Sequence, residues 1–360
     1  MTTITNSGSN LHITGTRQRI MTDLNKKLEV AGQEVATGMR ADVFSHLRTR
    51  ANETLSLRGD LARSEFFVSQ NTLLEQRLGA MSDTLVTMRA TTQSLMDIVV
   101  PNATSPSGTV SEIQVNAQAT INAFVTQTNL SFNNSSLFSG IATDVPPLQE
   151  WDEVNPASGF SPQGLVNGVV GGAILSQADA LAKIAQIDAI FSDDPSLPAG
   201  QTYQETFFNG APKADALGNP VPRQSALIAE GSLLEYGVQA NDQPFRDVLK
   251  GMAMLASVDA VLIQDRQAYR TWVETAMTSI ADGMSGMSDI GTRVGGFENL
   301  VADAKELQLS RIDIYESRIL DLEGVDPYEA VTRMTQLETT LQATYQVSAR
   351  LSQLSFLNYL

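Results

Sequence analysis

The amino-terminal part of the chain repeats apolar residues at every third or fourth position, the spacing that places side chains on one face of a helix. The first stripe consists of Ile20, Leu24, Leu28, Ala31 and Val35. Gly38 follows this stripe, and glycine commonly stands just past the end of a helix. The pattern therefore predicts an amphipathic helix that stops near Gly38.

A much longer helix is predicted over residues 49–100, which contain no proline. Its apolar positions are Leu74, Leu78, Met81, Leu85, Met88, Leu95 and Val99. Pro101 should end it, because proline has no N–H to donate within a helix. A helix of this length would measure about 75 Å, so we expect a rod, at least in part. A third stripe over residues 110–124 runs into a polar turn at residues 131–136.

Helical spacing returns after Pro244. From residue 287 to residue 322 the apolar positions are three or four apart, with polar Gln308 in the single gap. Asp326 and Pro327 then provide an N-cap and a favourable first helical residue. A last helix is predicted from there to Leu360, since neither glycine nor proline interrupts it.

The middle of the chain has a different pattern. Ten of the 13 prolines lie between Pro146 and Pro244, which indicates an insert. Residues 178–191 predict one short helix, and residues 225–229 and 233–238 predict a hairpin. The remainder, which includes the glycines at 164, 168, 171 and 172, is expected to be strands and loops.

Together these elements predict a mainly α fold: an elongated helical coiled-coil rod with paired N- and C-terminal helices and a small mixed α/β insert domain. We expect a terminal-helix assembly domain from residues 1–40 and 326–360. A helical rod domain should comprise residues 41–140 and 241–325. An insert domain with β-structure should comprise residues 141–240.

The two end helices each carry an apolar stripe that another surface must cover. They could cover each other, and their charges favour this weakly, since residues 1–50 carry +3 and residues 321–360 carry −3. One helix cannot cover the apolar carboxyl end, so we expect burial against other copies of the chain; docking into the chain's own globular core is the alternative. The assembly residues predicted on the first helix are Ile20, Leu24, Leu28, Ala31 and Val35. Those predicted on the last are Met334, Leu337, Leu341, Tyr345, Leu351, Leu354, Phe356, Leu357, Tyr359 and Leu360.

Composition excludes several classes of function. The net charge of −16 has the wrong sign for a nucleic-acid or anionic membrane partner. The sequence also contains no run of about 18 apolar residues, the length that a membrane-spanning helix needs. The chain has no cysteine and only two histidines, His12 and His46, which lack the spacing of metal ligands. The acids at 193–194 and 150–153 lack the glycine-bearing loop of a calcium site, so they are expected to be solvated loop acids. We expect no catalytic residues, metal or cofactor, and an acidic-loop enzyme is the alternative from another class.

Two terminal segments identify a family resemblance. Residues 25–40, NKKLEVAGQEVATGMR, resemble the amino-terminal signature of the bacterial flagellins and their hook–filament junction relatives. Residues 345–360, YQVSARLSQLSFLNYL, resemble the terminal helix of the junction members. The internal segments 137–147 and 236–247 favour a junction protein over a minor or main flagellin, which remains the alternative. Residues 42–47 depart from the Ser/Pro-Asp-Asp turn of many relatives.

The resemblance implies a structural subunit of the bacterial flagellum that joins hook to filament by self-assembly through its terminal helices. It also implies that the insert domain, residues 141–240, faces solvent. It implies an extracellular position after export through the flagellar secretion channel, consistent with the absence of a signal-like amino terminus. The implied partners are copies of the chain itself, flagellin, a neighbouring hook-associated protein and a cytoplasmic export chaperone at the C-terminal helix.

Overall fold

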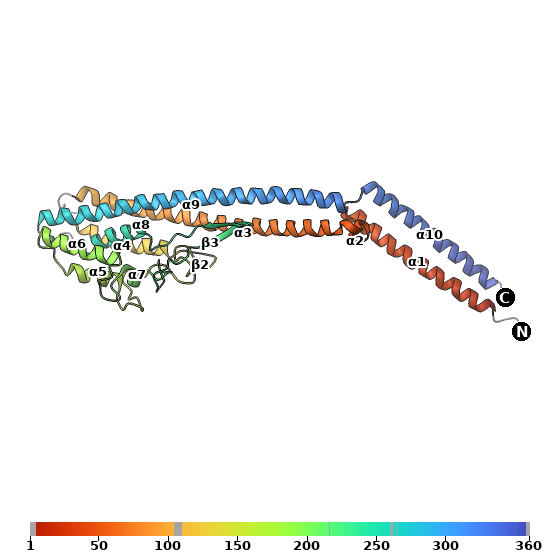
Figure 1. Ribbon diagram of the computed structural model, residues 1–360, viewed down its shortest axis with the longest axis horizontal. Coiled ribbons are helices and arrows are strands. Elements are labelled where there is room, and N and C mark those ends of the chain that lie inside the picture. The colour runs from red at the N-terminus through yellow and green to blue at the C-terminus, as the bar shows by residue number, and fades with distance from the viewer. Residues whose placement is uncertain (1–4, 104–109, 216, 260–261, 264, 358–360) are drawn as a thin grey trace. The chain divides into compact units, whose positions relative to one another are not determined.

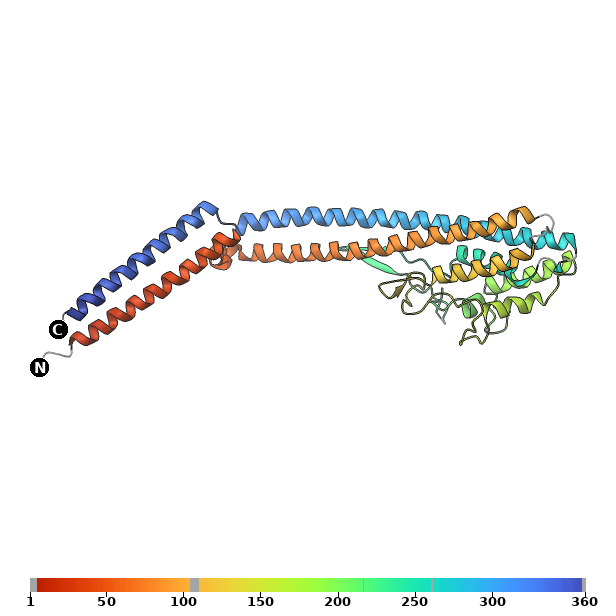
Figure 2. The same cartoon turned by 180° about the vertical axis from the view of Figure 1, so that it is seen from behind.

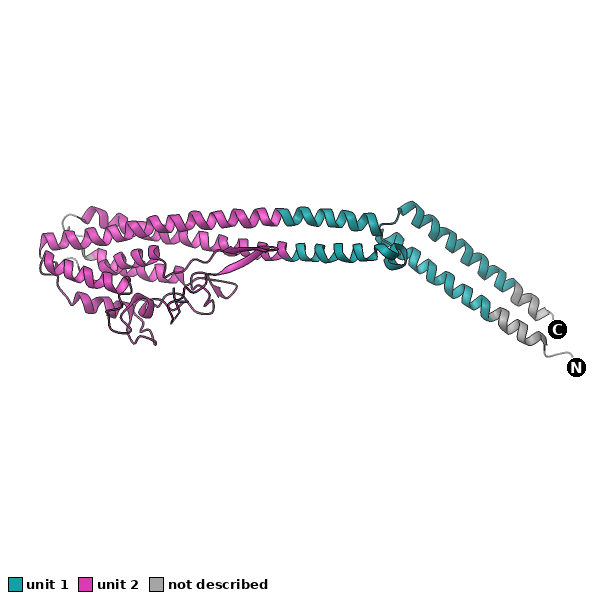
Figure 3. Ribbon diagram, in the orientation of Figure 1, with its two compact units in different colours: residues 1–66, 307–360 teal, residues 67–306 magenta. Residues whose placement is uncertain are grey.

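The computed structural model describes residues 5–103, 110–215, 217–259, 262–263 and 265–357, and these are mainly helical (Figure 1). The chain forms two compact units, one of residues 1–66 with 307–360 and the other of residues 67–306 (Figure 3). The boundaries fall inside two long helices, α3 (Ala51–Val99) and α9 (Arg266–Glu323). Among the described helices, none has a stretch apolar enough to cross a bilayer.

The first unit is built around paired end helices. α1 (Thr5–Thr37) and α10 (Pro327–Leu357) lie side by side and antiparallel in both views (Figures 1 and 2). α1 ends where Gly38 takes a φ of 69°, and the Asp326 carboxylate accepts the Tyr328 N–H at the start of α10 at 2.8 Å. Both predicted helix boundaries and the predicted pairing are confirmed.

Two linkers join the end helices to the rest of the first unit. The first contains α2 (Val43–Leu47) and a 3-10 turn, η1 (Arg48–Arg50), before α3 begins. Asp42 caps α2 by accepting the Ser45 N–H at 3.0 Å, and the hydrogen bonds from Ser45 lower the pKa of this carboxyl. Leu47, Leu57, Ile319 and Leu322 form a small buried cluster here, so α2, α3 and α9 are packed together.

The second unit has a continuous hydrophobic core. α4 (Val110–Thr128) packs on α8 (Gln243–Ser257), as its predicted apolar stripe requires. Phe245 on α8 contacts the rings of Phe124 and Phe138 at centroid distances of 6.3 and 5.6 Å. In the same core, the Trp272 indole of α9 donates to the Met254 carbonyl of α8 at 3.0 Å. This core holds the α3 and α9 segments of the unit against the shorter helices.

The insert contains more helix than its sequence predicts. α6 (Gln177–Phe191) was expected, but α5 (Pro162–Val170) and α7 (Tyr203–Thr206) lie where loops and strands were expected. Ser161 caps α5 by accepting the Gly164 N–H at 3.0 Å, and Gly171 closes it with a φ of 61°. The prediction that Gly164 and Gly168 are loop residues was therefore wrong, because these start and stop signals enclose both.

Two short hairpins make up the regular β-structure of the described residues. β3 (Ser225–Ala229) pairs antiparallel with β4 (Ser232–Glu235), which confirms the predicted hairpin with a shorter second strand. β1 (Ser131–Phe132) and β2 (Ser135–Ser136) turn at Asn133 and Asn134, whose φ values are 50° and 59°. Asparagine tolerates this left-handed conformation, so the expected polar turn is a tight hairpin. The three predicted domains stay a prediction.

Candidate assembly surface

The pairing of α1 and α10 covers only part of the predicted apolar stripes. Ala31 is buried, and Leu24 and Leu28 are half-buried on α1. The residues on α10 that become half-buried are Met334, Leu337 and Leu341. These six predicted residues are the ones that the helix pairing removes from water.

The other predicted residues with described side chains face outward. Ile20 is 48% exposed, Val35 is 37% exposed and Tyr345 is 50% exposed, and Val30, Val331 and Val347 are exposed near them. A single partner helix covers only a narrow strip of its neighbour, so these side chains lie outside the contact. Leu351, Leu354, Phe356 and Leu357 lie on α10 where side chains are not described, and Tyr359 and Leu360 lie outside the described residues.

The outer face of α10 has an unusual chemistry for a helix in water. Thr332, Thr335, Thr339 and Thr340 each donate their hydroxyl to the backbone carbonyl four residues earlier. Their hydroxyls are thereby satisfied within the helix, and their methyl groups remain available to a neighbour. With Val331 and Ala343, they line a shallow uncharged groove. All four hydroxyls would therefore keep their hydrogen-bond acceptors if this face were buried.

Two buried carboxylates lie where α1 and α10 meet the parts of α3 and α9 that belong to the first unit. Glu34 on α1 accepts a hydrogen bond from Arg333 on α10 at 2.9 Å. Glu323 at the end of α9 accepts two from Arg58 on α3, one of them at 3.0 Å, and these raise the pKa of the guanidinium. Neither pair was predicted from the sequence, because the partners lie about 300 and 265 residues apart.

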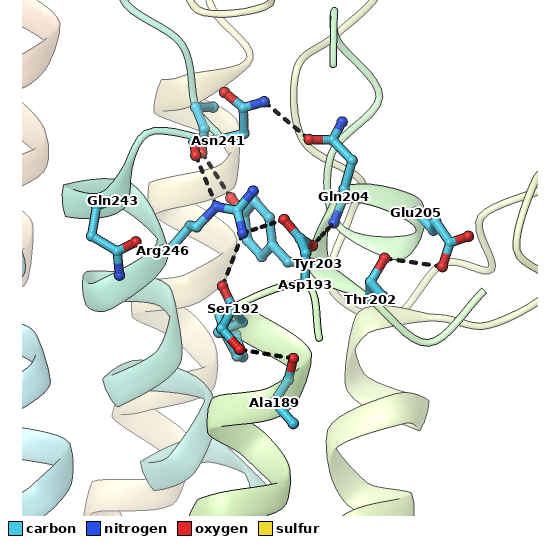
Figure 4. A network of polar contacts seen from close by, with 12 residues as sticks. Ala189, Ser192, Asp193, Thr202, Tyr203, Gln204, Glu205, Asn241, Gln243 and Arg246 are labelled. Carbon is cyan, nitrogen blue, oxygen red and sulfur yellow. Dashed lines mark hydrogen bonds and ion pairs between the residues drawn. The ribbon is translucent and has the colours of Figure 1, made fainter. Parts of the chain in front are cut away.

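The residues weighed for catalysis or metal binding have structural surroundings. His46 is exposed at the end of α2, and the side chain of His12 is not described. Asp193, expected to be a solvated loop acid, instead pairs with Arg246 at 2.5 Å and accepts the Gln204 N–H (Figure 4). Within the described part of the chain, no three acidic or histidine side chains gather in a way that could hold a metal ion.

Comparisons with known proteins agree with this arrangement. The bacterial flagellin N-terminal helical region matches residues 9–143, and the bacterial flagellin C-terminal helical region matches residues 272–360. A solved structure of a Vibrio parahaemolyticus protein, described as a flagellar hook-associated protein, has a similar fold. It is 14% identical, with a TM-score of 0.50 over 77% of this chain and 99% of that one. A search among curated proteins finds no match.

The matched regions contain the paired end helices and most of α3, α4 and α9. The chain belongs to the bacterial flagellin family. It is therefore a structural protein of the bacterial flagellum, which is an extracellular assembly, and the recognised resemblance and the mainly helical fold class are confirmed.

Proposed function

We propose that this protein is the hook–filament junction subunit of the flagellum and assembles through its end helices with copies of itself. The observation that carries the proposal is the set of apolar side chains, Ile20, Val35 and Tyr345 among them, that the α1–α10 pair leaves exposed. Isolated surface apolar residues are common, but here several gather on two neighbouring helices beside an uncharged face. Such a surface suits burial against further helices of the same kind.

The charge of the middle segment supports a junction rather than a filament. Residues 101–250 carry 15 acids and five bases, a net charge of −10. Like charges disfavour close packing of one insert against another. A single ring of subunits needs fewer contacts between inserts than a continuous array does. The internal segments 137–147 and 236–247 resemble the junction members of the family as well, and the Vibrio relative of similar fold is described as hook-associated.

A junction subunit needs two unlike axial partners, for which we propose a neighbouring hook-associated protein and flagellin. We also propose that the chain is exported through the flagellar channel without a cleavable signal, and that a cytoplasmic chaperone binds its C-terminal helix before export. A minor or main flagellin is the second candidate, because members of both kinds share the end helices. The protein is proposed to have no enzymatic activity.

Label position on intact flagella separates the two candidates. Antibody against the insert, residues 141–240, is expected to mark a short band beside the hook in the wild-type strain. A strain without the gene is expected to build hooks and to release filament protein into the medium. Label along the whole filament would reject the junction and favour flagellin. A deletion strain that still builds normal filaments would reject both the junction and the main flagellin, and would leave only a minor flagellin.

A further inference from the structure

A polar pocket opens in the part of the chain that neither flagellin region matches. The residues that line it lie between positions 155 and 209, in the loop before α5, on α7 and in the loops on either side of α7. The matched regions end at residue 143 and resume at residue 272. The pocket has a volume of about 520 Å³, within the range of about 300–1,000 Å³ that small-molecule sites occupy.

Hydrogen bonds fix the buried part of this pocket. Asn155 is buried and donates to the Asn209 Oδ1 atom at 2.8 Å and to the Thr206 carbonyl at 3.2 Å. Its own Oδ1 atom accepts the Ala157 N–H at 2.9 Å. Asn209 donates in turn to the Gln149 Oε1 atom at 3.1 Å. These bonds join loops far apart in the sequence, so the pocket is preorganised, which lowers the entropic cost of binding.

A second set of bonds holds Glu205 at the pocket. Its Oε2 atom accepts the Gly200 N–H at 2.8 Å and the Thr202 hydroxyl at 2.9 Å (Figure 4). Gly200 has a φ of 81°, and a Cβ atom there would lie 2.9 Å from the Ser158 carbonyl oxygen, so this wall requires glycine. The other carboxylate oxygen, Oε1, accepts no hydrogen bond from the residues that the structure describes, and the Glu205 side chain is exposed.

The pocket therefore presents a free acceptor together with free donors. The Oε1 atom of Gln204 accepts the Asn241 amide at 3.1 Å, and its own NH₂ group makes no hydrogen bond within the described residues. Asn209 uses only one of its two amide hydrogens. A hydroxyl group both donates and accepts, so it satisfies the Glu205 carboxylate and an amide donor alike. An ammonium ion would leave the amide donors unpaired, and the carboxylate would repel an anion.

We propose that this pocket binds a neutral saccharide. Neighbouring hydroxyl groups of one sugar ring bond to the Glu205 Oε1 atom and to the free amide hydrogens of Gln204. The C–H groups of the ring contact the apolar lining, to which Phe208 and Ala199 belong. A site that combines apolar lining with a few placed polar groups has the usual form of a small-molecule site. The inference does not rest on the proposed junction role, because none of these residues lies on α1 or α10.

Saturation-transfer-difference NMR on the full chain tests the proposal. The probes are the methyl glycosides of glucose, galactose, mannose and N-acetylglucosamine at millimolar concentration. We expect a signal from at least one of them, and no signal from any would overturn the proposal. The amino-sugar and uronate counterparts of the sugar that binds are then titrated in the same way. Tighter binding of the amino sugar, or equal binding of the uronate, would overturn the assignment to a neutral ligand.

Two variants locate the binding. Ala199→Phe places a ring in the pocket from an exposed position and leaves the hydrogen bonds of the pocket in place, so the signal should disappear. Glu205→Gln keeps an oxygen for Gly200 and Thr202 but replaces the free acceptor by a donor, so affinity should fall by about tenfold or more. Unchanged binding in either folded variant would overturn the proposal.

The matched control is Thr278→Phe, which adds the same ring at an exposed position of α9. Thr278 lines a different, charged groove of the same unit, beside Lys250 and Glu274. Binding should be unchanged in this control, and a loss equal to that of Ala199→Phe would overturn the location. Tryptophan fluorescence during urea unfolding establishes that each variant is folded, and Glu205→Gln carries the test if Ala199→Phe is not.

Discussion

The guanidinium of Arg246 lies over the ring of Tyr203, with its central carbon 4.5 Å from the ring centroid (Figure 4). The same group donates to the carbonyls of Asn241 and Phe191 at 2.8 and 2.9 Å and pairs with Asp193. One buried cation thus joins the start of α8 to the end of α6 and to α7. Burial also raises the pKa of Tyr203, which keeps this phenol neutral and able to donate to the Ala240 carbonyl.

We expect Arg246→Ala to lower the free energy of unfolding of the second unit by about 3 kcal/mol, because it leaves buried carbonyl groups without donors. The side chain of Arg246 is only 3% exposed, so solvent cannot replace it. Both tryptophans of the chain, Trp151 and Trp272, are buried in this unit, and their fluorescence follows its unfolding in urea. Arg270→Ala, which breaks an exposed pair with Glu274, should cost less than about 1 kcal/mol. Equal effects would contradict this account.

Two glycines of α9 should respond oppositely to the same substitution. A Cβ atom at Gly283 would lie 2.6 Å from the backbone nitrogen of Val248 on α8, whereas one at Gly291 would meet nothing within 4 Å. Gly283→Ala should destabilise the second unit by about 1–3 kcal/mol through overpacking. Gly291→Ala should stabilise it by up to about 1 kcal/mol, since alanine favours the helix. Urea unfolding measures both, and a stabilised Gly283→Ala would show that the two helices can move apart.

Local signals in the sequence were enough to predict most of the helical fold. Asp326 and Pro327 start α10, Gly38 stops α1, and Pro101 follows the end of α3. Each signal acts within a few residues of the chain, so a single sequence carries it. The helix α5 has comparable signals in Ser161 and Gly171, and it was missed because the surrounding prolines and glycines favoured a loop.

The candidate surface could be predicted only in part, because exposure depends on how neighbouring elements meet. Periodicity placed Ile20 and Leu24 on one stripe, yet the antiparallel pairing leaves Ile20 exposed and half-buries Leu24. The ion pairs Glu34–Arg333 and Arg58–Glu323 could not be predicted, for a related reason. Arg58 and Glu323 become partners only after two long helices fold back on each other, and no short motif records that contact.

Stability should depend on pH through Glu298 on α9. Burial, together with Asp83 and Glu75, raises the pKa of this carboxyl above its ordinary value of 4.5. The folded chain then binds a proton more readily than the unfolded chain, so stability falls as pH rises through the interval above about 4.5. Glu298→Gln should therefore stabilise the second unit slightly at neutral pH, by less than about 1 kcal/mol, and have no effect at lower pH. Urea unfolding at neutral and at acidic pH checks this. A larger stabilisation by Glu298→Gln at acidic pH would contradict the raised pKa.

The assembly proposal makes its sharpest prediction at Tyr345, which is 50% exposed on α10. Tyr345→Ser removes an apolar ring from the candidate surface but takes little from the contact with α1. The free energy of unfolding of the monomer should therefore change by less than about 0.5 kcal/mol. Incorporation into flagella, measured by labelling and motility, should nevertheless be lost. Leu175→Ser is the matched control, since Leu175 is 72% exposed in the insert and should tolerate the change in both measurements. Normal incorporation of Tyr345→Ser would remove this residue from the interface, and an unstable monomer would mean that its ring instead supports the helix pair.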